Sequence, residues 1–146
     1  MEKYFDDFSV GDRMDAGSHT ISLQEIKEFA ARYDPQPFHL DEAAAARSPF
    51  KRLVASGWHT AAIAMKLAVE SGVMKATGIL GVGVDELRWP KPVYPGDTLR
   101  LVLEVVEKKP ATPGSHRGVM RTRLSLFNQD DELVFTEVPI LLVARK

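Results

Sequence analysis

The stretch WHTAAIAMKLAVES, residues 58–71, decides the fold because it is apolar at nearly every position. Its only charged residues, Lys66 and Glu70, are four positions apart, and Gly72 follows as a helix C-cap. A helix that is apolar nearly all round must be buried nearly all round. We therefore predict a long central helix enclosed by the rest of the chain.

After this helix the pattern changes to a period of two, which is typical of β-strands. Strands are predicted at residues 79–89, 99–106, 120–127 and 133–143. Residues 128–132 form a predicted hairpin turn, Gly81 and Gly83 mark a bend, and Pro139 predicts an edge position or a bulge for the last strand.

A long buried helix followed by long antiparallel strands predicts one α+β domain over residues 1–146, with a curled antiparallel sheet wrapped around the central helix. Curling leaves the edge strands of the sheet unpaired. We therefore expect a homodimer, or a higher homo-oligomer, in which a second copy covers one edge.

Two shorter helices are predicted before the central one. Ser22 and Glu25 form a capping box, and the apolar residues that follow repeat with helical spacing as far as Tyr33. The dipeptide Asp34-Pro35 ends this helix, since the residue before a proline is disfavoured in the α region. A second short helix runs from Glu42 to about Arg47, with Asp41 as its N-cap.

The composition excludes several classes of protein. The formal net charge of −1 provides no broad basic field, so neither nucleic acid nor an anionic membrane is an expected partner. The absence of cysteine excludes disulfides, thiolate metal sites and a cysteine nucleophile. The acidic N-terminus lacks the apolar core of a secretory signal, and no window approaches the roughly 18 apolar residues of a membrane span. We expect a cytoplasmic protein.

The residues best suited to chemistry lie at 33–41, where Asp34 and His39 are five positions apart. Pro35 and Pro37 hold this segment out of helical geometry and predict a stiff, extended loop that aims both side chains at a common point. A histidine and a partly buried carboxylate can together remove and return a proton near neutral pH. The alternative is a structural turn in which His39 is simply packed.

A second candidate is Gly57 at the start of the central helix. Its backbone amide carries the positive end of the helix dipole and suits a carbonyl oxygen that gains negative charge. Gly57 also lets a ligand approach the backbone closely. The alternative is that Ser56 and Gly57 only cap the helix.

The run Asp34-Pro35-Gln36-Pro37-Phe38-His39-Leu40-Asp41, with Ala55-Ser56-Gly57-Trp58-His59-Thr60, resembles the hydratase motif of the MaoC-like dehydratases. This family includes the (R)-specific enoyl-CoA hydratases. The segments at residues 5–12 and 92–97 also match its pattern.

No histidine pair or carboxylate cluster has the spacing of metal ligands, so no metal is expected. The resemblance implies a hotdog fold, a homodimer and no cofactor. It further implies reversible syn addition of water to a trans-2-enoyl-CoA thioester, giving the (R)-3-hydroxyacyl-CoA. Asp34 and His39 would hold the water and move its protons, and the Gly57 amide would form the oxyanion hole. The family's best-characterised hydratases carry Asn where this chain has Gln36, so the substrate is more open than the reaction type.

Other residues were assigned lesser roles. His59 is expected to be a hydrogen-bonded structural residue, and His19 and His116 to lie on the surface without acidic partners. Lys51 and Arg52 are near enough to Gly57 to meet the phosphates of coenzyme A, although such side chains are usually only solvated.

Two further functions stay open at this point. A hotdog thioesterase would usually place an acid on the central helix, where the chain offers only Glu70 near the far end. A non-catalytic acyl-CoA binding module would leave Asp34 and His39 without a role. The aromatic residues Phe38, Phe50 and Trp58 indicate a covered pocket, but not the acyl group, the pathway, or whether the carrier is coenzyme A or acyl carrier protein.

Overall fold

The computed structural model describes residues 2–73, 75 and 79–146. The helices are a 3-10 turn at Phe5–Asp7, α1 (Leu23–Tyr33), α2 (Pro37–Leu40), α3 (Glu42–Ala46) and α4 (Gly57–Glu70). The strands are β1 (Arg13–Thr20), β2 (Leu80–Arg88), β3 (Thr98–Pro110), β4 (Arg117–Phe127) and β5 (Leu133–Ala144). In this part of the chain no helix is long and apolar enough to cross a membrane.

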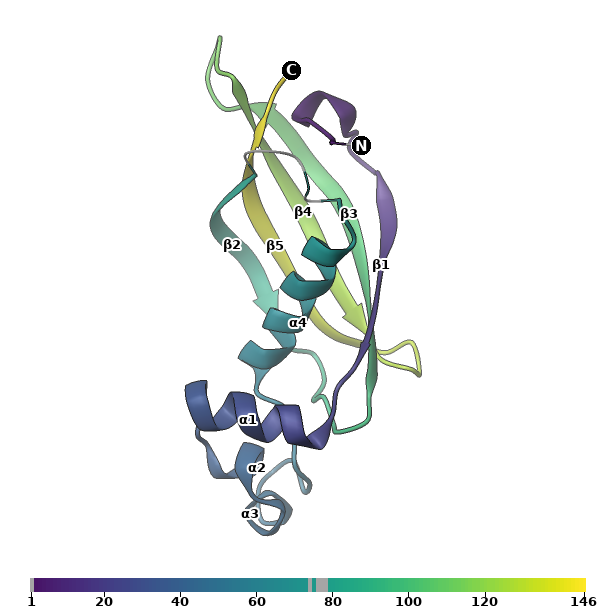
Figure 1. Ribbon diagram of the computed structural model, residues 1–146, viewed down its shortest axis with the longest axis vertical. Coiled ribbons are helices and arrows are strands. Elements are labelled where there is room, and N and C mark those ends of the chain that lie inside the picture. Colours follow the sequence, from purple (N-terminus) through teal and green to yellow (C-terminus); the bar gives the residue numbers. More distant parts are fainter. Residues whose placement is uncertain (1, 74, 76–78) are drawn as a thin grey trace.

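The strands form one antiparallel sheet in the order β1-β3-β4-β5-β2. The sheet curves around α4 without closing into a barrel, and the short helices α1 to α3 gather at the end where α4 begins (Figure 1). The prediction of an α+β fold with a curled sheet around a long central helix is confirmed. The two outer strands, β1 and β2, each pair on one side only within this chain.

The structure corrects the strand predictions at two places. β1 was not predicted, because Arg13–Thr20 lacks alternation and its register with β3 shifts between Asp15 and Ser18. Pro139 does not lie in an edge strand, since β5 runs between β4 and β2. The other alternative, a bulge, is confirmed next to it: the register of β2 with β5 shifts between Gly81 and Gly83, opposite Leu141 and Ile140, as expected of glycines at a bend.

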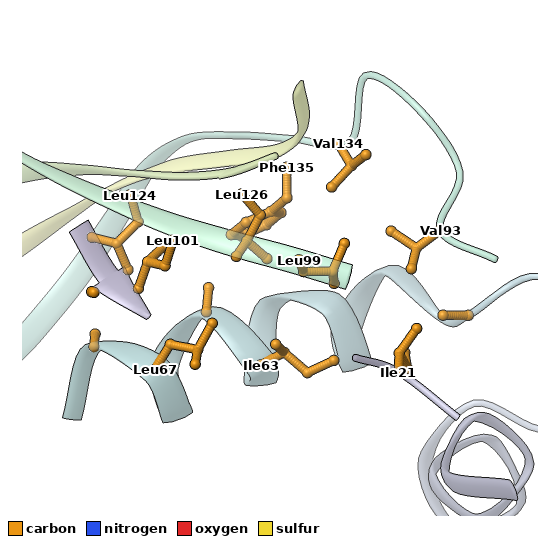
Figure 2. Packing of buried hydrophobic residues seen from close by; sticks show 14 of the residues in the cluster. Ile21, Ile63, Leu67, Val93, Leu99, Leu101, Leu124, Leu126, Val134 and Phe135 are labelled. Carbon is orange, nitrogen blue, oxygen red and sulfur yellow. The ribbon is translucent and has the colours of Figure 1, made fainter. Parts of the chain in front are cut away.

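The core lies between α4 and the inner face of the sheet. Ile63 and Leu67 of α4 point toward the leucines of β3 and β4 and toward Phe135 of β5 (Figure 2). Leu101 and Phe135 are fully buried there. Burial of each such side chain contributes about 1.5–3 kcal/mol to the free energy of unfolding, so this layer fixes the position of α4.

The prediction that α4 is buried nearly all round is wrong for the single chain. Trp58, Met65 and Val69 are 58%, 47% and 53% exposed, and their spacing of seven and four residues places them on one stripe of the helix. The reason is that the sheet does not close, so it covers only one side of α4. An apolar stripe of this kind indicates a surface that a further element covers.

The start of α1 follows the prediction. The Ser22 hydroxyl accepts from the Glu25 amide at 3.1 Å, and the Glu25 carboxylate accepts from the Ser22 amide at 3.0 Å. The same carboxylate lies 2.8 Å from Nε2 of His19, so His19 is not the unpartnered surface residue that was expected. His116 is exposed, as predicted.

His59 is structural but not hydrogen-bonded as expected. Its ring is 7% exposed and stacks on Phe29 of α1 at a centroid distance of 4.6 Å. Its buried Nδ1 has no hydrogen-bond partner among the described residues. Burial lowers the pKa of His59, opposed by the charge of Glu25 and assisted by that of His19. The stack ties the first turn of α4 to the helix that leads to Asp34.

This histidine makes stability sensitive to acid. Because the folded-state pKa lies below the ordinary value of 6.5, the unfolded chain binds the proton first as the pH falls through 6.5. The free energy of unfolding therefore falls with it. We expect the melting temperature of His59→Phe, which keeps a ring against Phe29, to fall less than that of the wild type between pH 7 and pH 5. His116→Phe is the control, and equal slopes for His59→Phe and wild type would contradict the prediction.

Candidate functional site

Asp34 and His39 are brought together by a change of backbone direction at the end of α1. Asp34 is the C-cap of α1 with φ −152° and ψ 70°, and Gln36 is extended, as the two prolines predict. The rest of the segment is not the predicted extended loop, because Pro37 begins the one-turn helix α2. Proline suits the first helical position, where its missing amide is not needed. This turn brings Nε2 of His39 to 3.3 Å from Oδ2 of Asp34.

The orientation of the His39 ring is fixed from its other side. The side chain is buried, and Nδ1 lies 2.6 Å from the backbone carbonyl oxygen of Val54. A carbonyl only accepts, so Nδ1 carries the proton and donates. Nε2 then faces a carboxylate oxygen of Asp34, within reach of a hydrogen bond when Nε2 carries a proton. Asp34 and His39 therefore form a carboxylate–imidazole pair between which a proton can move.

The Asp34 carboxylate receives two further hydrogen bonds. The Ser56 hydroxyl donates to Oδ2 at 2.7 Å, and the Gln36 amide donates to Oδ1 at 2.7 Å. Burial by itself would raise the pKa of Asp34, but these two donors and the charge of His39 outweigh it, and the pKa lies below its usual value. Asp34 is thus ionised at neutral pH.

Ser56 and Gln36 therefore have a role that the sequence did not reveal. Ser56 was expected only to cap the central helix, and it does so by accepting from the Trp58 amide at 3.2 Å. It is also fully buried against Asp34, a residue 22 positions earlier in the chain. Gln36 stands where an Asn was expected from the resemblance, and its longer side chain reaches back to the carboxylate two residues before it.

Gly57 is the first residue of α4, and its amide points out of the helix start. The amides of Trp58, His59 and Thr60 all bond to Ser56, whereas the Gly57 amide has no acceptor within the described residues. Packing within the protein gives a reason for glycine here that the sequence did not predict. A Cβ at this position would lie 2.6 Å from the indole of Trp89, whose Nε1 donates to the Gly57 carbonyl at 2.8 Å.

One cavity of about 540 Å³ contains all three predicted site residues, Asp34, His39 and Gly57. Its wall includes the three aromatic residues expected there, Phe38, Phe50 and Trp58, and also Trp89, which was not singled out. Trp58 is 58% exposed, so in the single chain this wall stays open to solvent. The site thus combines a carboxylate–imidazole pair, a helix N-terminal amide without an acceptor in the described part of the chain, and an apolar wall.

The basic residues near the mouth differ from the expectation. Lys51 and Arg52 are not part of the cavity wall, and the Arg52 guanidinium lies over the ring of Tyr94 at 3.7 Å. Lys91, which was not considered, lines the cavity and pairs with Glu132. Among residues 2–73, 75 and 79–146, no group of three or more acidic or histidine side chains is placed to hold a metal ion.

Comparisons with known proteins find relatives in sequence and in overall structure. The model of the MaoC-like domain matches residues 7–125. The uncharacterized protein YdeM of Bacillus subtilis is 34% identical over 140 residues, which span 96% of this chain and 98% of YdeM. The crystal structure of the MaoC-like dehydratase from Rhodospirillum rubrum superposes with a TM-score of 0.93 at 43% identity, over 99% of this chain and 98% of that one. The R-hydratase PhaJ1 from Pseudomonas aeruginosa, in its unliganded form, gives a TM-score of 0.76 at 30% identity, over 98% and 86%.

The hydrogen bonds to Asp34 predict a measurable titration. Replacing Ser56 by Ala removes the donor to Oδ2, so the carboxylate form loses stabilisation and the pKa of Asp34 should rise. Gln36→Leu should raise it in the same direction by removing the donor to Oδ1. Carbon-13 NMR titration of the Asp34 carboxyl measures both. Ser48→Ala, which removes a buried hydroxyl bonded to a backbone carbonyl, is the matched control. An unchanged Asp34 titration in Ser56→Ala would refute the assignment.

Proposed function

The chain belongs to the MaoC-like dehydratase family and has its hotdog fold, and from this premise we propose that it reversibly hydrates a trans-2-enoyl-CoA thioester to the (R)-3-hydroxyacyl-CoA. The observation that carries the proposal is the pair of Nε2 of His39 and Oδ2 of Asp34, 3.3 Å apart, in the same cavity as the unpartnered amide of Gly57. A proton-transfer pair beside a hydrogen-bond donor is what the addition of water to an enoyl thioester requires.

In this proposal the Gly57 amide binds the thioester carbonyl oxygen. As the hydroxyl adds to C3, negative charge moves through C2 to that oxygen, and the positive end of α4 stabilises it. The low pKa of Asp34 keeps it ionised, so the carboxylate can hold the water and accept its proton while the C3–O bond forms. Ser56 and Gln36 keep the carboxylate aimed during the reaction.

His39 completes the addition. The proton on Nε2 passes to C2 on the same face of the double bond as the added oxygen, and the neutral imidazole keeps its hydrogen bond from Nδ1 to Val54. The proton that Asp34 has taken from water then returns to Nε2 across the 3.3 Å contact, which restores the starting state. The net change is the addition of one water molecule, and the reverse order gives dehydration.

The thioesterase alternative has less support. Glu70, the acid of the central helix, is the last residue of α4, whereas Gly57 is the first. Its carboxylate pairs with Lys66 at 3.5 Å on the exposed side of the helix. A carboxylate at that end of α4 cannot reach a thioester carbonyl held at the Gly57 amide. The binding-module alternative predicts that Asp34 and His39 can be replaced without effect on a reaction.

Hydration of crotonyl-CoA, followed by loss of the enoyl thioester absorbance, tests the proposal. We expect turnover by the wild type and a loss of about 10²-fold or more in kcat for Asp34→Asn and for His39→Gln, because each removes a proton-transfer group. Asp130→Asn and His116→Gln, both exposed and outside the cavity, are the matched controls. Folding of each variant is checked by circular dichroism. Full activity in either site variant would reject the assigned roles.

A homodimer is the second part of the proposal. β2 is an edge strand whose residues Leu80, Val82 and Val84 are 49%, 59% and 50% exposed. The exposed stripe of α4, at Met65 and Val69, adds to this apolar surface. An edge strand with exposed apolar side chains favours pairing with another strand, and pairing with β2 of a second copy would bury it. The second copy would also close the open side of the fold.

Substitutions on this surface test the assembly. We expect the wild type to have the mass of a dimer in size-exclusion chromatography with light scattering, or that of a larger even-numbered oligomer. Val82→Glu and Val69→Glu should shift it toward the monomer, since each would bury a charge without a partner. Val10→Glu, at a valine that is 62% exposed outside this surface, is the control. A monomeric wild type would reject the proposed interface.

A further inference from the structure

Trp89 directly follows β2 and contacts Gly57 in two ways, although the proposed reaction does not use its side chain. Its Nε1 donates to the Gly57 carbonyl at 2.8 Å. Atoms of its indole ring lie 2.6–3.0 Å from the point that a Cβ on residue 57 would occupy. Trp89 also lines the cavity that contains Asp34 and His39. It therefore lies against the glycine whose amide is the candidate donor to the substrate.

Burial does not account for the bond between Trp89 and Gly57. Trp89 is 41% exposed, so water can accept from its indole N–H. The Gly57 carbonyl belongs to the first turn of α4, where a regular helix supplies each carbonyl with an amide four residues later. Neither group needs this bond for its hydrogen bonding to be satisfied. Its consequence is that it fixes the orientation of Gly57.

Gly57 needs such a constraint from outside the helix. Glycine has the greatest backbone freedom of any residue, and the amide of Gly57 has no acceptor in residues 2–73, 75 and 79–146. A hydrogen-bond donor stabilises developing negative charge well only if it is aimed before the reaction starts. The indole holds the Gly57 carbonyl by a bond and the Gly57 Cα by contact, which restricts rotation about the two backbone dihedrals of this residue.

The position of Trp89 is fixed by the rest of the fold. Its ring meets the ring of Trp58 edge-on at a centroid distance of 5.2 Å and lies 6.3 Å from that of Phe135, a fully buried core residue. Pro90 follows Trp89, and a residue before a proline is restricted to extended conformations. Phe135 belongs to β5, the strand that pairs with β2. Packing in the sheet thus determines where the indole lies, and the indole in turn orients Gly57.

We propose that Trp89 is a positioning residue for the substrate carbonyl: its indole holds Gly57 so that the amide of Gly57 points at the thioester oxygen. The amide contacts the substrate, and Trp89 acts through Gly57. Loss of the indole N–H should weaken stabilisation of the negative charge on that oxygen more than it weakens binding of the uncharged thioester. This inference rests on the proposed function for the role of the Gly57 amide as donor to a thioester oxygen.

Carbon-13 NMR of bound saturated thioesters tests the inference without turnover. The probes are butyryl-CoA and octanoyl-CoA labelled with carbon-13 at C1, whose resonance moves downfield when a donor draws electron density from the carbonyl. We expect a downfield shift on binding to the wild type. Trp89→Phe, which keeps a ring without an N–H, should lose most of this shift, and so should Trp89→Leu. Trp58→Phe, which removes the neighbouring indole and leaves the bond to Gly57 in place, should keep it.

Kinetics of crotonyl-CoA hydration give a second measurement that a merely structural role would not move. Trp89→Phe should lower kcat about tenfold or more and change KM by less than about threefold, since the oxygen gains charge only in the transition state. Circular dichroism and thermal melting check that each variant is folded.

The inference and the proposed function fail in different ways. If the wild type binds the saturated thioesters with a downfield shift that the Trp89 variants lose, but hydrates no enoyl-CoA, the hydratase function is rejected and the inference stands. Equal bound shifts in the wild type and both Trp89 variants would overturn the inference even if crotonyl-CoA is hydrated. Absence of binding of both probes, or a bound wild-type resonance at the position of the free thioester, would overturn it as well.

Discussion

The hydroxyl of Ser56 joins the two halves of the site. It accepts from the Trp58 amide and so begins α4, and it donates to the Asp34 carboxylate that ends α1. Packing in the core fixes the position of α4. Because Ser56 is at the start of α4, its hydroxyl also fixes the position of the Asp34 carboxylate, which belongs to a separate helix. His39 then takes its place between Asp34 and the Val54 carbonyl. The Gly57 amide follows Ser56 directly, so Ser56 positions both the Asp34–His39 pair and this amide.

The aromatic wall depends on the same junction. Trp89 is at the end of β2, and its indole lies against the Cα of Gly57, where a side chain on residue 57 would collide with it. The bond from its Nε1 to the Gly57 carbonyl holds β2 to the start of α4. Glycine is therefore required here by packing within the protein, which leaves the amide side of the residue open to the cavity.

The chain by itself leaves one side of its fold uncovered. The sheet curves around α4 without closing (Figure 1), and β2 pairs on one side only. On α4 the apolar side chains of Met65 and Val69 are exposed. The proposed second copy would cover this side.

The sequence alone determined the features that depend on local chemistry and periodicity. The capping box of Ser22, the central helix, four of the five strands, and the grouping of Asp34, His39 and Gly57 were all predicted, the last with the help of a family resemblance. Only the tertiary structure decided which groups meet from distant parts of the chain. The Ser56–Asp34 bond and the Trp89–Gly57 contact leave no trace in spacing or composition, because each depends on how α4 packs against a sheet formed later in the chain. The edge strand β1 was missed for a related reason, since its pairing with β3 holds residues that lack the alternation of a strand.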